Sequence, residues 1–107
     1  MAKPTAQVRR IQEMSQRLEH AAGALRSFET ALGALREAQE DIAVLETYYT
    51  SRLWRKDFED DEAGKVPRDI DRGVLSEDAV YDLLTDNRRL HTVMLDAVKA
   101  YVDPDGE

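Results

Sequence analysis

Apolar residues recur every three or four positions along the first half of the chain. The spacing is that of side chains lining one face of packed helices. After Leu35 the stripe shifts by three residues, which changes the winding of a coiled coil. The first series consists of Ile11, Met14, Leu18, Ala21, Leu25, Phe28, Leu32 and Leu35.

Gly23 and Gly33 lie off this stripe, and each weakens a helix by about 1 kcal/mol relative to alanine. The stripe keeps its phase through both glycines, whereas a break in the helix would usually reset it. The pattern therefore predicts one continuous helix over residues 5–49, about 65 to 70 Å long. A bend near residues 23–27, giving three main helices, is the alternative.

A second, shorter helical pattern covers residues 51–63. Ser51 or Thr50 can cap its start, because a side-chain oxygen there can accept a free backbone N–H. Three- and four-residue spacing predicts one apolar face made by Leu53, Trp54 and Phe58.

A connector over residues 64–75 is predicted next. Gly64 suits the left-handed residue that closes a helix, and Pro67 prevents the helix from resuming. Val66 and Ile70 are the apolar residues expected to anchor the connector inward.

The third helical pattern spans residues 76–102. Ser76 is the expected N-cap, and Leu75 can pack on Val80 as a hydrophobic staple. Asn87 falls within the apolar stripe, where a polar residue commonly specifies register or association state at some cost in stability. With no strand pattern, the sequence predicts a single all-α domain, residues 1–107, built as an antiparallel helical hairpin.

The two long helices differ in length, and this predicts self-association. A return helix of about 26 residues would cover only residues 25–49 of the first helix. Residues 8–18 would then project with an uncovered apolar stripe, and such stripes usually mark an interface. Two hairpins covering each other's projections would form a homodimer with a coiled-coil-like or four-helix core. A monomeric bundle is the alternative.

The charge balance narrows the classes of partner. The 107 residues carry a formal net charge of −7, which disfavours nonspecific binding to nucleic acid or to an anionic membrane. The chain has no cysteine, no apolar stretch near the roughly 20 residues of a membrane span, and no signal-peptide pattern. We therefore expect a cytoplasmic protein with no nucleic-acid or membrane partner.

Five of the seven aromatic residues and a run of carboxylates fall between residues 48 and 84. They suggest a surface that binds a protein partner, although the aromatics alone would also suit a hinge core and the acids an ion-paired, solvated face. The candidate interaction residues are Tyr48, Tyr49, Trp54, Asp57, Phe58, Asp61, Lys65, Asp78 and Tyr81, with Asn87 as the residue for assembly.

The acids do not match a known catalytic or metal-binding pattern. An EF-hand loop with Gly64 at its sixth position would place Ala63 and Ile70 where acidic ligands are required. Glu37/Glu40 and Glu59/Glu62 resemble the first half of the magnesium-binding motif of all-α nucleotide pyrophosphohydrolases, but the second half, E-x-x-D, is missing from the third helix. His20 and His91 lack ligand spacing.

These patterns favour a non-enzymatic interaction or scaffold protein with no catalytic residue, cofactor or metal site. The alternative is an all-α enzyme that handles a small molecule or nucleotide through clustered carboxylates and a divalent metal.

Several longer motifs resemble one protein family. They are I-Q-E-M at 11–14, L-x-x-Y-Y at 45–49, W-x-x-D-x-x-x-D-E-A-G-K at 54–65 and P-x-D-I-x-R-G-V-L-S-E-D-A-V-Y-D-L-L at 67–84. The chain resembles an uncharacterised family of short bacterial helical proteins described as a domain of unknown function. The resemblance implies a small, mostly helical protein and supplies no activity, cofactor or catalytic residue.

Overall fold

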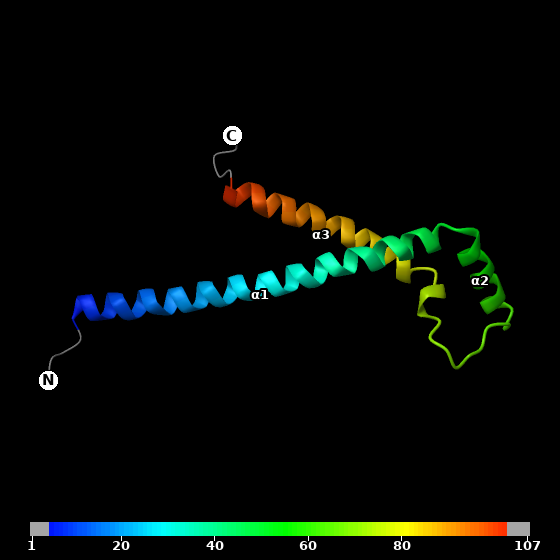
Figure 1. The fold of residues 1–107 in the computed structure, drawn as a ribbon, viewed down its shortest axis with the longest axis horizontal. Helices are drawn as coiled ribbons and strands as arrows, with labels where there is room; N and C mark the ends of the chain where they lie inside the picture. Colours follow the sequence, from blue (N-terminus) through cyan, green and yellow to red (C-terminus); the bar gives the residue numbers. More distant parts are fainter. Residues whose placement is uncertain (1–4, 103–107) are drawn as a thin grey trace. The chain divides into compact units, whose positions relative to one another are not determined.

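The computed structural model describes residues 5–102 and is all-α, as the sequence predicts. Its elements are α1 (Ala6–Tyr49), α2 (Arg52–Glu62), the short 3-10 helix η1 (Gly73–Leu75) and α3 (Ala79–Val102) (Figure 1). No strand occurs among residues 5–102. The predicted helices were 5–49, 51–63 and 76–102, so the start of the third differs most.

α1 begins at a side-chain cap and runs through both of its glycines. Thr5 Oγ1 accepts a hydrogen bond from the backbone N–H of Val8 at 3.1 Å, satisfying one of the free donors at the start of the helix. A Cβ built on Gly33 would have no neighbour within 4 Å, and one on Gly23 would meet only the end of the Arg26 side chain at 3.9 Å. Neither glycine is required by close packing.

The chain divides into two compact units, residues 1–39 and 40–107. In the described part of the first unit, α1 carries a stripe of exposed apolar side chains. Leu18 and Leu25 are each 71% exposed, and Phe28 is 58% exposed. This stripe includes residues 8–18, the predicted projection, and it is uncovered within the first unit. We call it the N-terminal stripe, and its large members are Val8, Ile11, Met14, Leu18, Leu25 and Phe28.

The second unit holds the apolar core of the described chain, and that core is small. Across residues 5–102, the buried apolar side chains are Leu75, Val80 and Leu84. η1 contacts both α2 and α3, so Leu75 joins the connector to the first turns of α3. Leu75 and Val80, the two residues of the predicted hydrophobic staple, are both buried members of this core.

Local rules explain where α2 begins and ends. Ser51 Oγ accepts a hydrogen bond from the Trp54 N–H at 3.4 Å and caps the N-terminus. At the other end, Gly64 adopts a φ of +76°, and the N–H groups of Gly64 and Lys65 donate to the carbonyls of Asp61 and Asp60. This pair of bonds is the Schellman motif, which requires a left-handed residue and so favours glycine.

α3 begins at Ala79, three residues later than its predicted start. Ser76 Oγ does accept a hydrogen bond from the Ala79 N–H, at 3.1 Å. However, the N–H of Ser76 donates to the Gly73 carbonyl, so Ser76 also closes η1 and has extended backbone angles. Residues 77 and 78 form a turn between the two helices. None of the helices in the described range is long and apolar enough to cross a membrane.

Candidate functional site

The candidate residues from the sequence lie largely in the elbow, which we define as residues 48–78 and which comprises the end of α1, α2, the connector and η1. Tyr48 in the last turn of α1 donates its hydroxyl hydrogen to Asp57 Oδ2 of α2 at 2.5 Å. Burial raises the pKa of Tyr48 to about 12, and the hydrogen bond and negative charge of Asp57 act in the same direction. Tyr48 therefore stays protonated at neutral pH and ties the two helices together.

Three of the candidate aromatics form a continuous row beside this bond. The rings of Tyr49 and Trp54 meet edge to face, with centroids 5.0 Å apart and planes at 70°. The rings of Trp54 and Phe58 stack at 5.2 Å and 17°. Trp54 Nε1 also donates to the Val74 carbonyl at 2.9 Å, which links α2 to η1. All three rings are half-buried, so the row serves as the hinge core of the elbow.

Asp61 clamps the connector onto α2. Its carboxylate accepts a hydrogen bond from Arg72 Nη1 at 2.8 Å and lies 3.6 Å from Arg68 Nη1. The Asp61 side chain is only 15% exposed, so this pair is shielded more than an ordinary surface ion pair. The Nε of Arg72 is enclosed and has no hydrogen-bond partner. This unsatisfied donor offsets part of the stabilisation that the Asp61–Arg72 pair contributes.

The sequence pattern does not predict Arg72 as the partner of Asp61. Arg72 lies 11 residues from Asp61, outside helical spacing, so only the path of the connector brings the two together. The main sequence signal was an arginine just before a turn glycine.

The remaining candidate residues do not join this cluster. Lys65 is exposed, and within residues 5–102 its side chain makes no ion pair. Asp78 is also exposed, and its carbonyl accepts the Asp82 N–H in the turn that leads into α3. Tyr81 is 59% exposed on α3. The contiguous part of the predicted surface is therefore the set from Tyr48 to Asp61.

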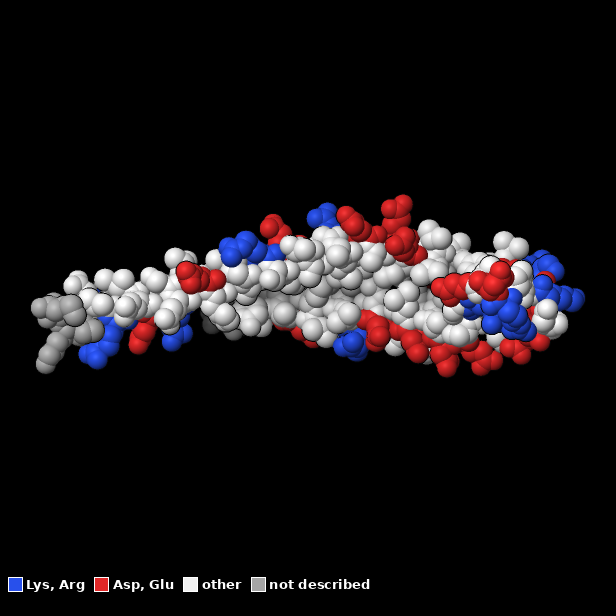
Figure 2. All heavy atoms as spheres, turned by 90° about the horizontal axis from the view of Figure 1, so that it is seen from below, with Lys and Arg blue, Asp and Glu red and all other residues white. Residues whose placement is uncertain are grey.

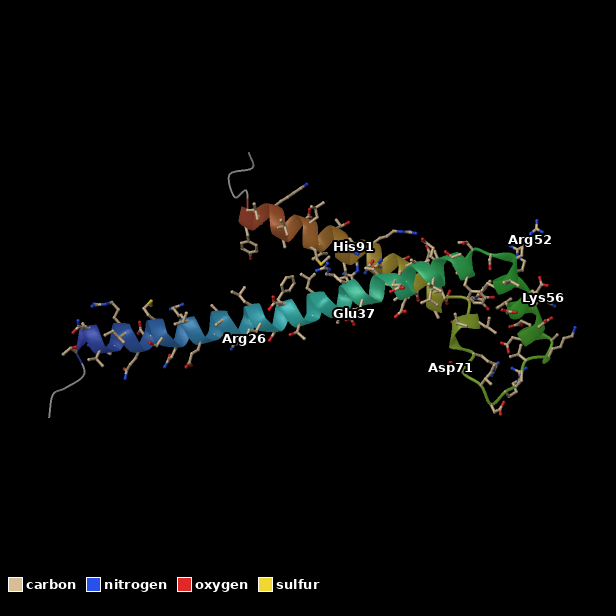
Figure 3. All side chains as sticks on the ribbon, viewed as in Figure 1. Arg26, Glu37, Arg52, Lys56, Asp71 and His91 are labelled. Atoms are coloured by element: carbon tan, nitrogen blue, oxygen red, sulfur yellow. The ribbon has the colours of Figure 1, made fainter. Side chains whose placement is uncertain are left out.

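The predicted apolar face of α2 is wrong at Leu53. This side chain is 66% exposed, whereas Trp54 and Phe58 are half-buried. The covered face of α2 instead includes Asp57 and Asp61, because their partners Tyr48 and Arg72 pack against that side. Basic side chains occupy the outer side, and Figure 3 shows Arg52 and Lys56 pointing away from the connector.

Asn87 is half-buried on α3, three residues after the buried Leu84 and seven after the buried Val80. This spacing puts it on the face that carries Val80 and Leu84. Beside it, Arg88 Nη2 reaches Glu46 Oε2 of α1 at 3.8 Å, a pair that is largely exposed and contributes little.

The acids of the elbow are spread out. Within residues 5–102, no three histidine, aspartate or glutamate side chains gather closely enough to hold a metal ion. Both E-x-x-E pairs from the sequence, Glu37/Glu40 and Glu59/Glu62, are exposed. Figure 2 shows acidic and basic groups interspersed over the elbow end of the molecule.

Surface hollows border the elbow on several sides. A hollow of about 530 Å³ lies between α2 and the connector and has both apolar and charged walls. A second hollow, of about 460 Å³, lies where α1 turns into α2, and we call it the junction groove. The sequence pattern does not predict the junction groove, because Val44 lies outside the predicted stripe of α1 and Leu53 is assigned to the apolar face of α2. The groove is lined by Ala43, Val44, Thr47, Tyr48, Ser51 and Leu53.

Comparison with known proteins gives the family of the chain but no activity. No curated protein and no solved structure matches the sequence. The family described as "Domain of unknown function (DUF4298)" matches residues 11–97, which is most of the chain and includes the whole elbow, and the protein therefore belongs to this family.

Proposed function

We propose that this protein is a non-enzymatic interaction protein that acts as a helical homodimer. The observation that carries the proposal is the N-terminal stripe, six large apolar side chains that are 40 to 71% exposed in the first unit. Contiguous exposed apolar surface of this kind marks an interface more often than it remains solvated.

The small core supports the same proposal. With Leu75, Val80 and Leu84 as the buried apolar side chains of residues 5–102, one copy gains little from burial. Burying one large apolar side chain contributes about 1.5 to 3 kcal/mol. Covering the stripe with a second copy would therefore add several such contributions, comparable to those of the core itself.

Sedimentation equilibrium tests the proposal directly, since one chain has a mass of 12.2 kDa. We expect a dimer at micromolar concentration. Leu18→Glu and Leu25→Glu should each weaken it, and because both leucines are 71% exposed, neither change disturbs the fold of a single copy. Glutamate is also a good helix former, so α1 should keep its helicity.

Gln16→Glu is the matched control. Gln16 is exposed on α1 and lies two residues from Leu18, about 200° around the helix. The Gln16→Glu substitution introduces the same glutamate side chain on the face of α1 opposite Leu18, so it should leave the association unchanged. A wild-type protein that sediments as a single chain at these concentrations would refute the proposal.

The elbow supports a second contact surface, for a basic protein partner. Residues 54–78 contain nine acidic and five basic residues, and Glu59, Glu62, Asp69, Glu77 and Asp78 are exposed there. Quantitative affinity capture with the wild type and with Glu62→Lys/Glu77→Lys tests this part. Equal recovery of every captured protein by both baits would remove the elbow from the proposal.

A further inference from the structure

We propose that the junction groove is the seat for the start of α1 from a second copy, in an antiparallel dimer. This inference rests on the proposed self-association and adds its direction, its register and the residues in contact. The second copy would contribute Val8 and Ile11, which are 40% and 57% exposed.

The junction groove suits an apolar occupant because its hydroxyl groups are already engaged. Thr47 Oγ1 donates to the Ala43 carbonyl at 3.1 Å, and Ser51 Oγ donates to the Tyr48 carbonyl at 2.6 Å. The Tyr48 hydroxyl donates to Asp57. What remains open to a ligand is methyl, methylene and ring surface, including Val44 at 64% and Leu53 at 66% exposure.

The walls of the groove are also held in place before anything binds. The Tyr48–Asp57 hydrogen bond spans the turn between α1 and α2, and Ser51 caps α2 within that turn. A groove with preset walls loses little conformational freedom when it is filled, which favours a defined occupant.

The charges along α1 select the antiparallel direction. Residues 6–17 contain three arginines and one glutamate, whereas residues 37–46 contain four acids and neither lysine nor arginine. Parallel pairing of two α1 helices would set like charges against each other, while antiparallel pairing sets the basic start of one against the acidic end of the other. Such complementarity specifies orientation more than it adds affinity.

Antiparallel pairing also brings the right apolar residues together. When two helices of equal length pair in opposite directions, the first turns of one meet the last turns of the other. The first turns of α1 carry Val8 and Ile11, and its last turns supply Ala43 to Tyr48 of the groove. Arg9 and Arg10 of the second copy would then lie near Glu46.

Cross-linking of single-cysteine variants tests this register, because the natural chain contains no cysteine. Val8→Cys and Thr47→Cys are purified separately, mixed, unfolded and refolded together, and treated with a short bis-maleimide. We expect a covalent dimer from the mixture and none from either variant alone. A mixture of Gln16→Cys with Thr47→Cys is the matched control and should give no product.

The outcomes separate this inference from the proposal on which it rests. A covalent dimer from Val8→Cys alone would show parallel pairing and overturn the inference. A non-covalent dimer in sedimentation without the 8–47 product would overturn the groove as the seat and leave self-association standing. A monomer in sedimentation would overturn both.

Val44→Glu gives an independent readout. It puts a carboxylate into the groove at a site that is 64% exposed in one copy, so circular dichroism should show the helicity of the wild type. We expect the dimer dissociation constant to rise at least tenfold, equivalent to about 1.4 kcal/mol. An unchanged dissociation constant would place the contact elsewhere on the molecule.

Discussion

Replacing Trp54 with phenylalanine should destabilise the elbow by about 2 kcal/mol. The Trp54 Nε1–H bond to the Val74 carbonyl, at 2.9 Å, is lost. A neutral hydrogen bond contributes about 1 kcal/mol net, and leaving a half-buried carbonyl without its donor costs about 1 kcal/mol more. Phenylalanine keeps an aromatic ring against Tyr49 and Phe58, so most of the packing within the row should survive.

Urea unfolding followed by circular dichroism measures this effect, with both proteins at the same concentration because association shifts apparent stability. For a domain of about 100 residues, a loss of 2 kcal/mol lowers the Tm by about 10 °C. Amide exchange should locate the change. Relative to the wild type, the Trp54→Phe variant should exchange faster in the connector and η1, with a smaller effect in the first turns of α1.

Tyr101→Phe is the matched control for the Trp54 substitution. Tyr101 is 86% exposed at the end of α3, so the change should alter stability by less than about 0.5 kcal/mol. Equal urea midpoints for Trp54→Phe and the wild type would refute the reasoning, since they would mean that the bond to Val74 does not hold the connector in place.

Three further predictions concern single positions. The pKa of Tyr48 is about 12 in the folded chain and about 10 in the unfolded chain. The protonated Tyr48 therefore contributes a stabilisation that is fully present below pH 10 and is lost as the pH rises from 10 to 12. Because solvent reaches the pair, we expect the free energy of unfolding measured with urea to fall by about 1 kcal/mol across that range, and Tyr48→Phe should abolish this fall. Gly64→Ala places a side chain at φ +76° and should destabilise by about 1 kcal/mol in the same assay, whereas Gly33→Ala, with open space around it, should stabilise by a similar amount. Asn87→Leu should raise the Tm and change the association state in sedimentation, and no change in either would argue against a position in the helix seam.

The helices could be predicted from the sequence because their determinants are local. The apolar stripe, the Ser51 cap and the left-handed Gly64 each act within four residues of their own position. The late start of α3 could not be predicted in this way, because Ser76 has to close η1 as well as cap α3. The end of η1 and the N-cap of α3 overlap at Ser76, and the residues just before Ser76 belong to η1.

The contacts of the elbow were harder to predict because they depend on the path of the connector. Trp54 binds a backbone carbonyl 20 residues away, and a carbonyl leaves no mark in the sequence. Asp61 pairs at a shorter distance with Arg72, 11 residues along the chain, than with the nearer Arg68. Tyr49, Trp54 and Phe58 of the predicted aromatic group lie together, whereas Tyr81 lies outside the row. The charged and apolar neighbours of the row follow from tertiary packing.

Trp54 gives this protein a natural optical probe of the elbow. It is the single tryptophan of the chain, and its indole ring lies between Tyr49 and Phe58 with its N–H bound to Val74. Its emission wavelength and quenching by iodide therefore report the docking of the connector without any added dye. Circular dichroism reports the long helices instead, so the two signals recorded on one sample would show whether the elbow opens before the helices melt. A partner that contacts the elbow would also be visible in the emission before it has been identified.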